Sequence, residues 1–251
     1  MDNITGMSEF EVRLYDCGPD GTCGVRTMFN FMQSTADNHS KSLGTSVNLM
    51  AEKNLTWVYA RFYADIFRYP KIYEKVRCET WRSGVTEGMV NREFIMTDDS
   101  GRELLRATSS LALIDRESRK PVAIPEFIIS QFDSHRGRAI DYVPFQIEKR
   151  EKTDYIYNAA TRYEDIDING HMNNASYAQL FFESGYSVME GAAVLKSIDI
   201  LFKGEILYNH VIKCGSHYIS GAENKLYHRA YNENRGRVSA ESITEWKLKK
   251  G

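Results

Sequence analysis

The sequence predicts an α+β protein in which one plan, a long helix followed by antiparallel strands, occurs twice. Each half of the chain contains one stretch with apolar residues at helical spacing. Each of these stretches is followed by several segments in which apolar and polar residues alternate. With 251 residues, of which 42% are hydrophobic, the chain can form one large domain or two small ones, each with its own core.

In the first half, a short strand is expected at 11–15, then a turn-rich loop, then a helix at 26–43. The apolar stripe of this helix consists of Met28, Phe31, Met32 and Ala36. Gly44 follows, where helices commonly end on glycine. Strands are then expected at 57–67, 76–82, 91–97 and 104–114. In the first of them, alternation predicts one shared face for Val58, Ala60, Phe62, Ala64 and Ile66.

The second half repeats this order, with a strand at 154–159, a polar loop and a helix at 173–189. Strands are then expected at 198–203, 211–219, 225–232 and 237–248. A local echo between 73–76 and 208–211 aligns Pro70 with Glu205. We therefore expect an N-terminal domain at 1–134, a linker at 135–152 and a C-terminal domain at 153–251. The basic residues of the linker suggest a solvated face or, as the alternative, a site for an acidic partner; they are Arg136, Arg138, Lys149, Arg150 and Lys152.

Bulk composition excludes several classes of protein. The 32 basic residues are balanced by 34 acidic ones, and the net charge of −2 argues against a nucleic-acid binder driven by global charge. No apolar run approaches 18 residues, so no membrane insertion is expected, and the N-terminus does not resemble a signal peptide. The cysteines lack the two-residue spacing of metal or redox motifs, so we expect reduced thiols in a cytoplasmic protein without a metal; they are Cys17, Cys23, Cys78 and Cys214.

The stretch 165–174 is the strongest candidate site, because it holds two carboxylates, three carboxamides and one imidazole directly before the second helix. Asp and Asn at a helix start are ordinary capping residues, so a polar helix-entry loop is one interpretation. His171 is not needed for capping. The N–H groups of a helix start can also hold an oxyanion, so the segment offers what hydrolysis of a carbonyl compound requires.

The pattern Asp167-x-Asn169-x-His171-x-Asn173-Asn174 resembles the active-site motif of the acyl-ACP thioesterases, which are found in plant plastids and many bacteria. Further segments across residues 8–248 fit the same family: Asn54-Leu55-x-Trp57-Val58, Arg68-Tyr69-Pro70, Glu79-Thr80-Trp81, Arg106-Ala107-Thr108-Ser109-Ser110 and Ile124-Pro125-Glu126. The resemblance implies a tandem pair of hotdog folds and an activity that releases fatty acid from acyl carrier protein. The chain lacks a long N-terminal extension, so the bacterial form is the closer likeness.

By this resemblance, Asp167, Asn169 and His171 are expected to be catalytic together with Glu205 on the following strand segment. We expect Glu205 to activate water, and His171 and Asn169 to position the water and the thioester carbonyl. Asp167 would orient the network, or attack directly as a nucleophile. Many plant members have Cys directly after the Glu, whereas this chain has Ile206, so a thiol there cannot take part.

We also expect the backbone N–H groups at the start of the second helix, near Asn173 and Asn174, to stabilise the oxyanion. The residues expected to line the acyl-chain pocket belong to the first half, although plain core is the alternative for the helix stripe; they are Met28, Phe31, Met32 and Trp57. The first half offers Pro70 for Glu205 and Asp20-Gly21-Thr22 near Asn169-Gly170-His171, so one complete site per chain is expected. The resemblance further implies acyl carrier protein as the partner; we expect no cofactor, and a homodimer is one possible assembly.

Three other functions stay open from the sequence. An acyl-CoA thioesterase is the nearest, and a comparison of turnover on the two carriers would separate it. A hotdog dehydratase would use an Asp/His dyad that does not sit in an Asp-x-Asn-x-His loop. A non-enzymatic acyl-thioester sensor on this fold should lack a counterpart of Glu205 and would often carry a DNA-binding segment.

Overall fold

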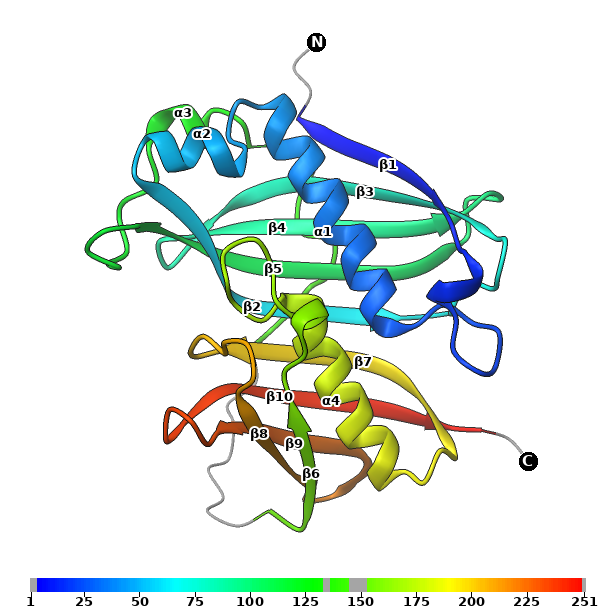
Figure 1. The fold of residues 1–251 in the computed structure, drawn as a ribbon. Coiled ribbons are helices and arrows are strands. Elements are labelled where there is room, and N and C mark those ends of the chain that lie inside the picture. Colours follow the sequence, from blue (N-terminus) through cyan, green and yellow to red (C-terminus); the bar gives the residue numbers. More distant parts are fainter. Residues whose placement is uncertain (1–3, 133–135, 145–152, 250–251) are drawn as a thin grey trace. The chain divides into compact units, whose positions relative to one another are not determined.

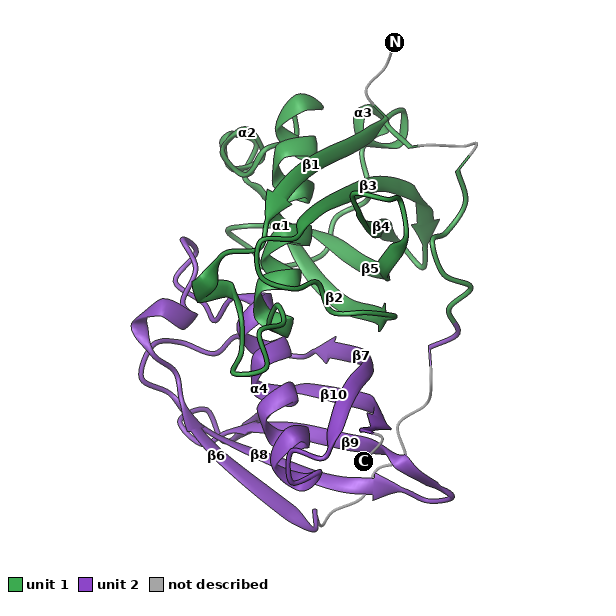
Figure 2. Ribbon diagram, turned by 90° about the vertical axis from the view of Figure 1, so that its right-hand side faces the viewer, with its two compact units in different colours: residues 1–142 green, residues 143–251 purple. Residues whose placement is uncertain are grey.

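The computed structural model describes residues 4–132, 136–144 and 153–249, and the chain forms two compact units, 1–142 and 143–251 (Figure 2). The predicted linker at 135–152 contains residue 135 and residues 145–152, including Lys149, Arg150 and Lys152, which lie outside the described residues. The expected boundaries therefore stay a prediction. Among the described residues, no helix is long and apolar enough to cross a membrane.

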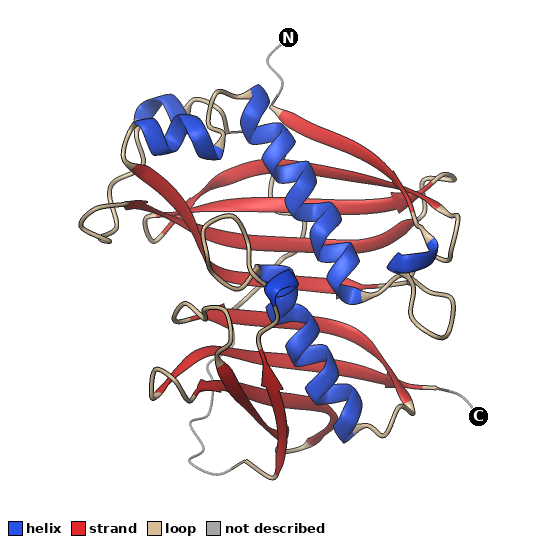
Figure 3. Cartoon of the chain, viewed as in Figure 1, coloured by secondary structure: helices blue, strands red, loops and turns tan. Residues whose placement is uncertain are grey.

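In unit 1, helix α1 (Val25–Ser42) lies across five antiparallel strands (Figures 1 and 3). The strand order is β1 (Thr5–Glu11), β3 (Lys75–Thr86), β4 (Met89–Asp98), β5 (Glu103–Asp115) and β2 (Leu55–Ile66). The apolar side of α1 is buried through Met28, Phe29 and Met32, and Phe29 packs on Phe62 with ring centroids 4.8 Å apart. The short helices α2 (Val47–Glu52) and α3 (Glu126–Ile129) were not predicted.

Unit 2 repeats the plan around helix α4 (Asn174–Val188). Its strand order is β7 (Ala193–Phe202), β10 (Arg237–Leu248), β9 (Ala222–Asn232), β8 (Val211–Ile219) and β6 (Tyr155–Ala160). The helix lies so close to β10 that a Cβ added to Gly185 would come within 2.3 Å of the Trp246 ring. Glycine is therefore required at this position if Trp246 is to stay in the core.

Two expectations for unit 1 were wrong. The first strand runs from Thr5 to Glu11 rather than 11–15, and Leu14–Asp16 forms a 3-10 turn, η1, in which the Asp16 carboxylate accepts the Arg13 N–H at 2.8 Å. The shared face of β2 is interrupted by a bulge between Tyr59 and Arg61. Because a bulge shifts the side-chain alternation by one residue, Val58 is 41% exposed while Phe62 is buried.

The basic residues at the start of the predicted linker are not a freely solvated face. Arg136 forms an ion pair with Glu79 at 2.7 Å, and its guanidinium lies 3.7 Å from the ring centroid of Trp81. Arg138 lies 3.6 Å from the buried carboxylate of Glu93. Residues 136–139 are thus attached to the sheet of unit 1, and these two cations are already committed to carboxylates.

The two units share a hydrogen-bonded scaffold at the helix entry. In unit 1 the N–H of Cys23 donates to the carbonyl of Pro70 at 2.8 Å, and in unit 2 the N–H of Met172 donates to the carbonyl of Ile206 at 2.8 Å. The counterpart of Pro70 is therefore Ile206, so the predicted match with Glu205 was wrong by one residue. The φ angles of Tyr73 (66°) and Asn209 (60°) agree with this corrected alignment.

Candidate active site

The polar loop before α4 is a closed turn anchored at both ends. The 3-10 turn η2 (Tyr163–Asp165) precedes it, and Asp165 accepts the Arg162 N–H at 2.9 Å. The loop then closes with the N–H of Asp167 donating to the carbonyl of His171 at 2.8 Å. Gly170 has a φ of +78°, a conformation that costs glycine little and other residues more. The turn therefore presents the side chains of its neighbours in a fixed arrangement.

The carboxylate of Asp167 organises this turn from within. One oxygen accepts the N–H of Asn169 at 2.8 Å and that of His171 at 3.4 Å. The other oxygen lies 3.4 Å from the amide nitrogen of the Asn169 side chain. These contacts orient Asn169 and His171, so the geometry favours the orienting role expected for Asp167 over direct attack.

His171 and Glu205 lie face to face. The Nε2 of His171 is 3.3 Å from the Oε2 of Glu205, and the side chains are 30% and 41% exposed. Glu205 lies in the loop after β7, three residues past the end of the strand, which corrects the expected strand position. The bond from Met172 N–H to the Ile206 carbonyl ties this loop to the helix entry. An imidazole and a carboxylate thus reach the same solvent-accessible point.

The start of α4 offers fewer free N–H groups than expected. The N–H of Asn173 donates to the carbonyl of Asp165 at 2.8 Å, and the Asn173 side chain caps the helix by accepting the N–H of Ala175 at 2.8 Å. Among the described residues, no backbone acceptor binds the N–H of Asn174. The backbone N–H of Asn173 already donates to Asp165, so of the two N–H groups expected to bind the oxyanion, that of Asn174 is the one left as a candidate.

Two residues that the sequence analysis did not place in the site support it. The hydroxyl of Tyr177 donates to the carbonyl of Gly204 at 3.0 Å, and burial raises the pKa of this phenol. The Nδ1 of His210 accepts the N–H of Leu207 at 3.2 Å and lies 3.0 Å from the Asn232 amide. The bonds to Gly204 and Leu207 hold the loop that carries Glu205. Tyr177 follows Asn173 by four residues, and that helical spacing is a signal that could have identified it.

Three of the four cysteines are buried, and the residue after Glu205 is not a thiol. Ile206 is fully buried beside Glu205, and burial raises the pKa values of Cys23, Cys78 and Cys214 to about 12. Cys17 is partly exposed, and burial followed by the charges of Asp16 and Asp20 raises its pKa as well. Among the described residues, no group of three His, Cys, Asp or Glu side chains could hold a metal ion.

The residues expected to line an acyl-chain pocket all lie in unit 1, in two environments. Met28 and Met32 are fully buried on α1, and Phe31 stacks on Phe10 with ring centroids 4.3 Å apart. Trp57 packs against a separate cluster of Met50, Leu113 and Ile128. A pocket formed by these residues stays a prediction.

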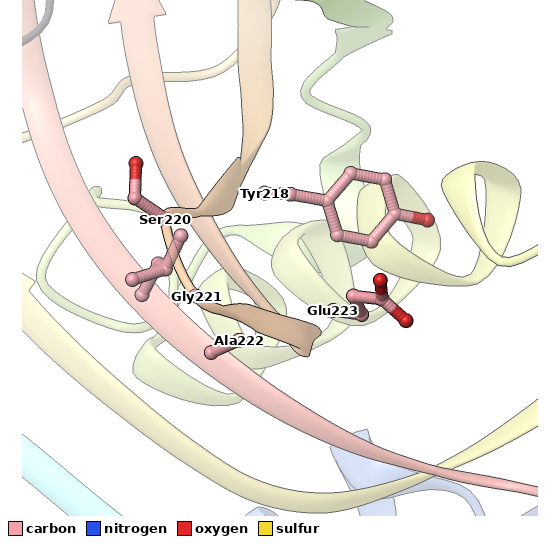
Figure 4. A pocket seen from close by; sticks show the side chains of 6 residues that line it. Tyr218, Ser220, Gly221, Ala222 and Glu223 are labelled. Carbon is pink, nitrogen blue, oxygen red and sulfur yellow. The ribbon is translucent and has the colours of Figure 1, made fainter.

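A surface hollow in unit 2 lies outside the candidate site. It is lined by the β8–β9 turn, with Tyr218 and Glu223 extending beside it (Figure 4). It contains neither His171 nor Glu205, and its one carboxylate has no imidazole among the lining residues. The hollow therefore adds nothing to the hydrolytic arrangement.

Comparison with known proteins identifies relatives over nearly the whole chain. Residues 4–132 match the acyl-ACP thioesterase N-terminal domain, and residues 148–248 match the acyl-ACP thioesterase C-terminal domain. The chloroplastic acyl-[acyl-carrier-protein] hydrolase FATB3 of Cuphea viscosissima is 26% identical, over 99% of this chain and 64% of the relative. The chloroplastic dodecanoyl-[acyl-carrier-protein] hydrolase of Umbellularia californica is 29% identical, over 70% of this chain and 49% of the relative.

The chain spans between about half and two thirds of the length of the first curated relatives it matches. Among solved structures, an acyl-ACP thioesterase from Bacteroides thetaiotaomicron superposes with a TM-score of 0.86 at 21% identity, covering 98% of both chains. This likeness confirms the predicted fold, a tandem double hotdog.

Proposed function

Because the chain belongs to the acyl-ACP thioesterase family, with its N-terminal and C-terminal domains both present, we propose that it hydrolyses fatty acyl-ACP to free fatty acid and holo-ACP. The observation that carries this proposal is the approach of His171 and Glu205 to 3.3 Å at the polar loop before α4. An acyl-CoA thioesterase remains the alternative, since the hydrolytic groups would be the same for either carrier.

The proposed reaction begins with attack by water on the thioester carbonyl. Glu205 takes a proton from the water while the water oxygen forms a bond to the carbonyl carbon. The resulting tetrahedral oxyanion would accept the N–H of Asn174 at the start of α4, where the helix dipole also favours negative charge. Asn169, held by Asp167, would donate its side-chain amide to the same carbonyl oxygen.

Collapse of the intermediate breaks the carbon–sulfur bond and releases the thiol of the carrier. The leaving thiolate needs one proton, which the Glu205–His171 pair returns. The products are a carboxylic acid and a thiol, and no redox change occurs. The carboxylate of Asp167 is occupied by three donors in its own turn, which supports water rather than an acyl anhydride as the route.

We place the protein in the cytoplasm, with acyl carrier protein as its macromolecular partner. Four free cysteines are typical of a reducing compartment. The curated relatives named above are chloroplastic, so the location is tested separately by fractionation of cells that produce this chain.

The test is hydrolysis of a panel of acyl-ACPs and the matching acyl-CoAs by the purified protein. We expect equal amounts of free acid and thiol from acyl-ACP, without added metal and in the presence of a chelator. Higher kcat/KM on acyl-CoA across the panel would favour the alternative carrier. Release of neither product from any substrate would refute the hydrolytic function.

A further inference from the structure

Two arginines face each other inside unit 1. Arg82 on β3 and Arg92 on β4 occupy directly opposite positions in the antiparallel ladder. They are 1% and 3% exposed. Opposite residues of a ladder point to the same face, so two like charges lie together in the interior.

In the described part of the chain, the groups that contact these guanidiniums are hydroxyls, a side-chain amide oxygen and an imidazole nitrogen. Arg82 donates to the Gln131 side-chain oxygen at 2.5 Å and to the Thr45 hydroxyl at 2.8 Å. Arg92 donates to the hydroxyls of Ser40 at 3.1 Å and Thr80 at 3.3 Å, and it lies 3.2 Å from the His39 Nδ1. Across the described part of the chain, neither guanidinium has a carboxylate within ion-pair distance.

The nearest carboxylate in sequence is directed elsewhere. Glu93 accepts from Ser83 and Thr108 and from the N–H of Ala139, and it lies beside Arg138. Adjacent residues in a strand point to opposite faces, so Glu93 cannot compensate Arg92. Uncompensated buried charge is costly, and burial followed by repulsion from Arg92 lowers the pKa of Arg82 to about 9. An anion bound between the pair would remove that cost.

A third donor belongs to the same cluster. The Nε1 of Trp57 is buried and has no acceptor among the described residues. The Arg82 guanidinium lies 5.8 Å from the Trp57 ring centroid. Trp57 also packs against the apolar cluster of Met50, Leu113 and Ile128. The site therefore combines excess N–H donors and positive charge with an adjoining hydrocarbon surface.

We propose that Arg82, Arg92 and Trp57 bind a carboxylate that is attached to a hydrocarbon chain. A guanidinium presents two parallel N–H groups that match the two oxygens of a carboxylate. A phosphate dianion would bring more charge and a bulky tetrahedral group into a dry interior, so the smaller planar anion fits better. A free fatty acid and the distal carboxylate of a dicarboxylic acyl group both present this chemistry.

Binding is tested by titrating the intact protein with decanoate and, separately, with decanol, followed by calorimetry and tryptophan fluorescence. We expect decanoate to bind and to raise the melting temperature, and decanol to bind more weakly. Arg82→Met and Trp57→Phe should each weaken decanoate binding by about tenfold or more, the effect of losing a charge-assisted or buried hydrogen bond. Arg77→Met is the matched control, because Arg77 lies on the same strand with an exposed side chain.

Equal binding of decanoate and decanol would overturn the proposal, as would unchanged decanoate affinity in folded Arg82→Met. If Arg82→Met does not fold, Trp57→Phe decides, and an unchanged affinity in that variant overturns the proposal. This binding test does not depend on hydrolysis, so its failure is distinct from failure of the proposed enzymatic function.

A second measurement separates the two sources of the carboxylate and does rest on the proposed function. If the free acid is the ligand, decanoate should alter hydrolysis of decanoyl-ACP by the wild type and not by Arg82→Met. If a distal carboxylate is the ligand, the ACP thioester of decanedioic acid should have a lower KM than its monomethyl ester. Arg82→Met should abolish that difference.

Discussion

The 3.3 Å approach of His171 to Glu205 predicts how single substitutions act on the reaction. His171→Ala and Glu205→Gln should each lower kcat on acyl-ACP by about 10²-fold or more, the contribution of a general acid–base group. The two side chains are 30% and 41% exposed, so the melting temperature should change little. Glu223→Gln is the control, because this exposed carboxylate lies at the β8–β9 turn. Near-normal kcat in both site variants would refute the assignment.

The buried thiols predict that alkylation spares the activity. Three cysteines have pKa values raised to about 12 by burial, so they carry almost no thiolate at neutral pH. Iodoacetamide should therefore modify Cys17 at most in the folded protein, and all four cysteines after denaturation, as counted by mass spectrometry. Turnover should stay within about tenfold, roughly 1.4 kcal/mol in the barrier. If iodoacetamide inactivated the wild type but not Cys17→Ser, the expectation that no cysteine is needed for turnover would be wrong.

The sequence predicted which side chains meet at the candidate site, but not which backbone N–H groups there are already hydrogen-bonded. The meeting of His171 with Glu205 was expected from a family pattern that links distant segments. The loss of the Asn173 amide to Asp165 could not be predicted, because it depends on how η2 folds back on the helix entry. The helical spacing of Tyr177 from Asn173 could have identified this residue but not its acceptor, because the acceptor is a backbone carbonyl and any residue type supplies one.

At the scale of elements, the cap of α4 joins stability to the site. Asn173→Ala removes the acceptor of the Ala175 N–H and should cost about 1 kcal/mol of unfolding free energy. Asn173→Ser keeps a capping oxygen and should recover most of that loss in denaturant titrations. Equal stability of the Ala and Ser variants would show that the cap contributes nothing.

Helix α1 gives a prediction with two separable outcomes. Met32 is fully buried, so Met32→Trp should overpack the core of unit 1 and cost about 1–3 kcal/mol. If this helix also faces the acyl chain, the variant should prefer shorter chains, since each excluded methylene removes about 0.8 kcal/mol of burial. Melting temperature and product chain length are measured together. If the variant is destabilised and its product chain lengths are unchanged, α1 does not contact the acyl chain and has a structural role only.

Long periodic elements were predictable, and short or irregular ones were not. Helix α1 and strands β8 and β10 follow the expected ranges closely, because one face of each is buried and the apolar period is regular. Helix α2 has only six residues, too few for a helical period to show. The bulge at Tyr59 and Arg61 inserts one residue without any Gly or Pro to mark it, so the alternation of β2 was extended too far.

At the scale of the whole chain, the two units share a scaffold but differ in chemistry. The shared helix-entry bonds match Gly18 with Asp167, Thr22 with His171 and Tyr69 with Glu205. Unit 1 therefore has neither the imidazole nor the facing carboxylate, which agrees with one complete site per chain. The alignment based on the local similarity of residues 73–76 and 208–211 was wrong by one residue. Four similar residues are too few to determine which positions of the two units make equivalent backbone hydrogen bonds.

The interior of unit 2 predicts how stability depends on pH. His228 is fully buried, its Nδ1 lies 2.7 Å from the Ser216 hydroxyl, and its Nε2 lies 2.7 Å from the Thr244 hydroxyl. Burial, followed by repulsion from His217, lowers the pKa of His228 to about 3. The unfolded chain binds this proton near pH 6.5, so the stabilising contribution is complete above pH 6.5 and declines as the pH falls toward 3.

Between pH 6.5 and pH 5 this one group should remove about 2 kcal/mol of unfolding free energy, at about 1.4 kcal/mol per pH unit. His228→Gln replaces the imidazole with a group that is neutral at every pH tested. Whatever the stability of this variant at pH 7, its unfolding free energy should fall by about 2 kcal/mol less than that of the wild type between pH 6.5 and pH 5. The measurement is urea unfolding at pH 7, 6 and 5. His210→Gln is the comparison, because His210 is only partly buried and should change the slope less. A His228→Gln slope equal to that of the wild type would mean that acid sensitivity arises elsewhere in the chain.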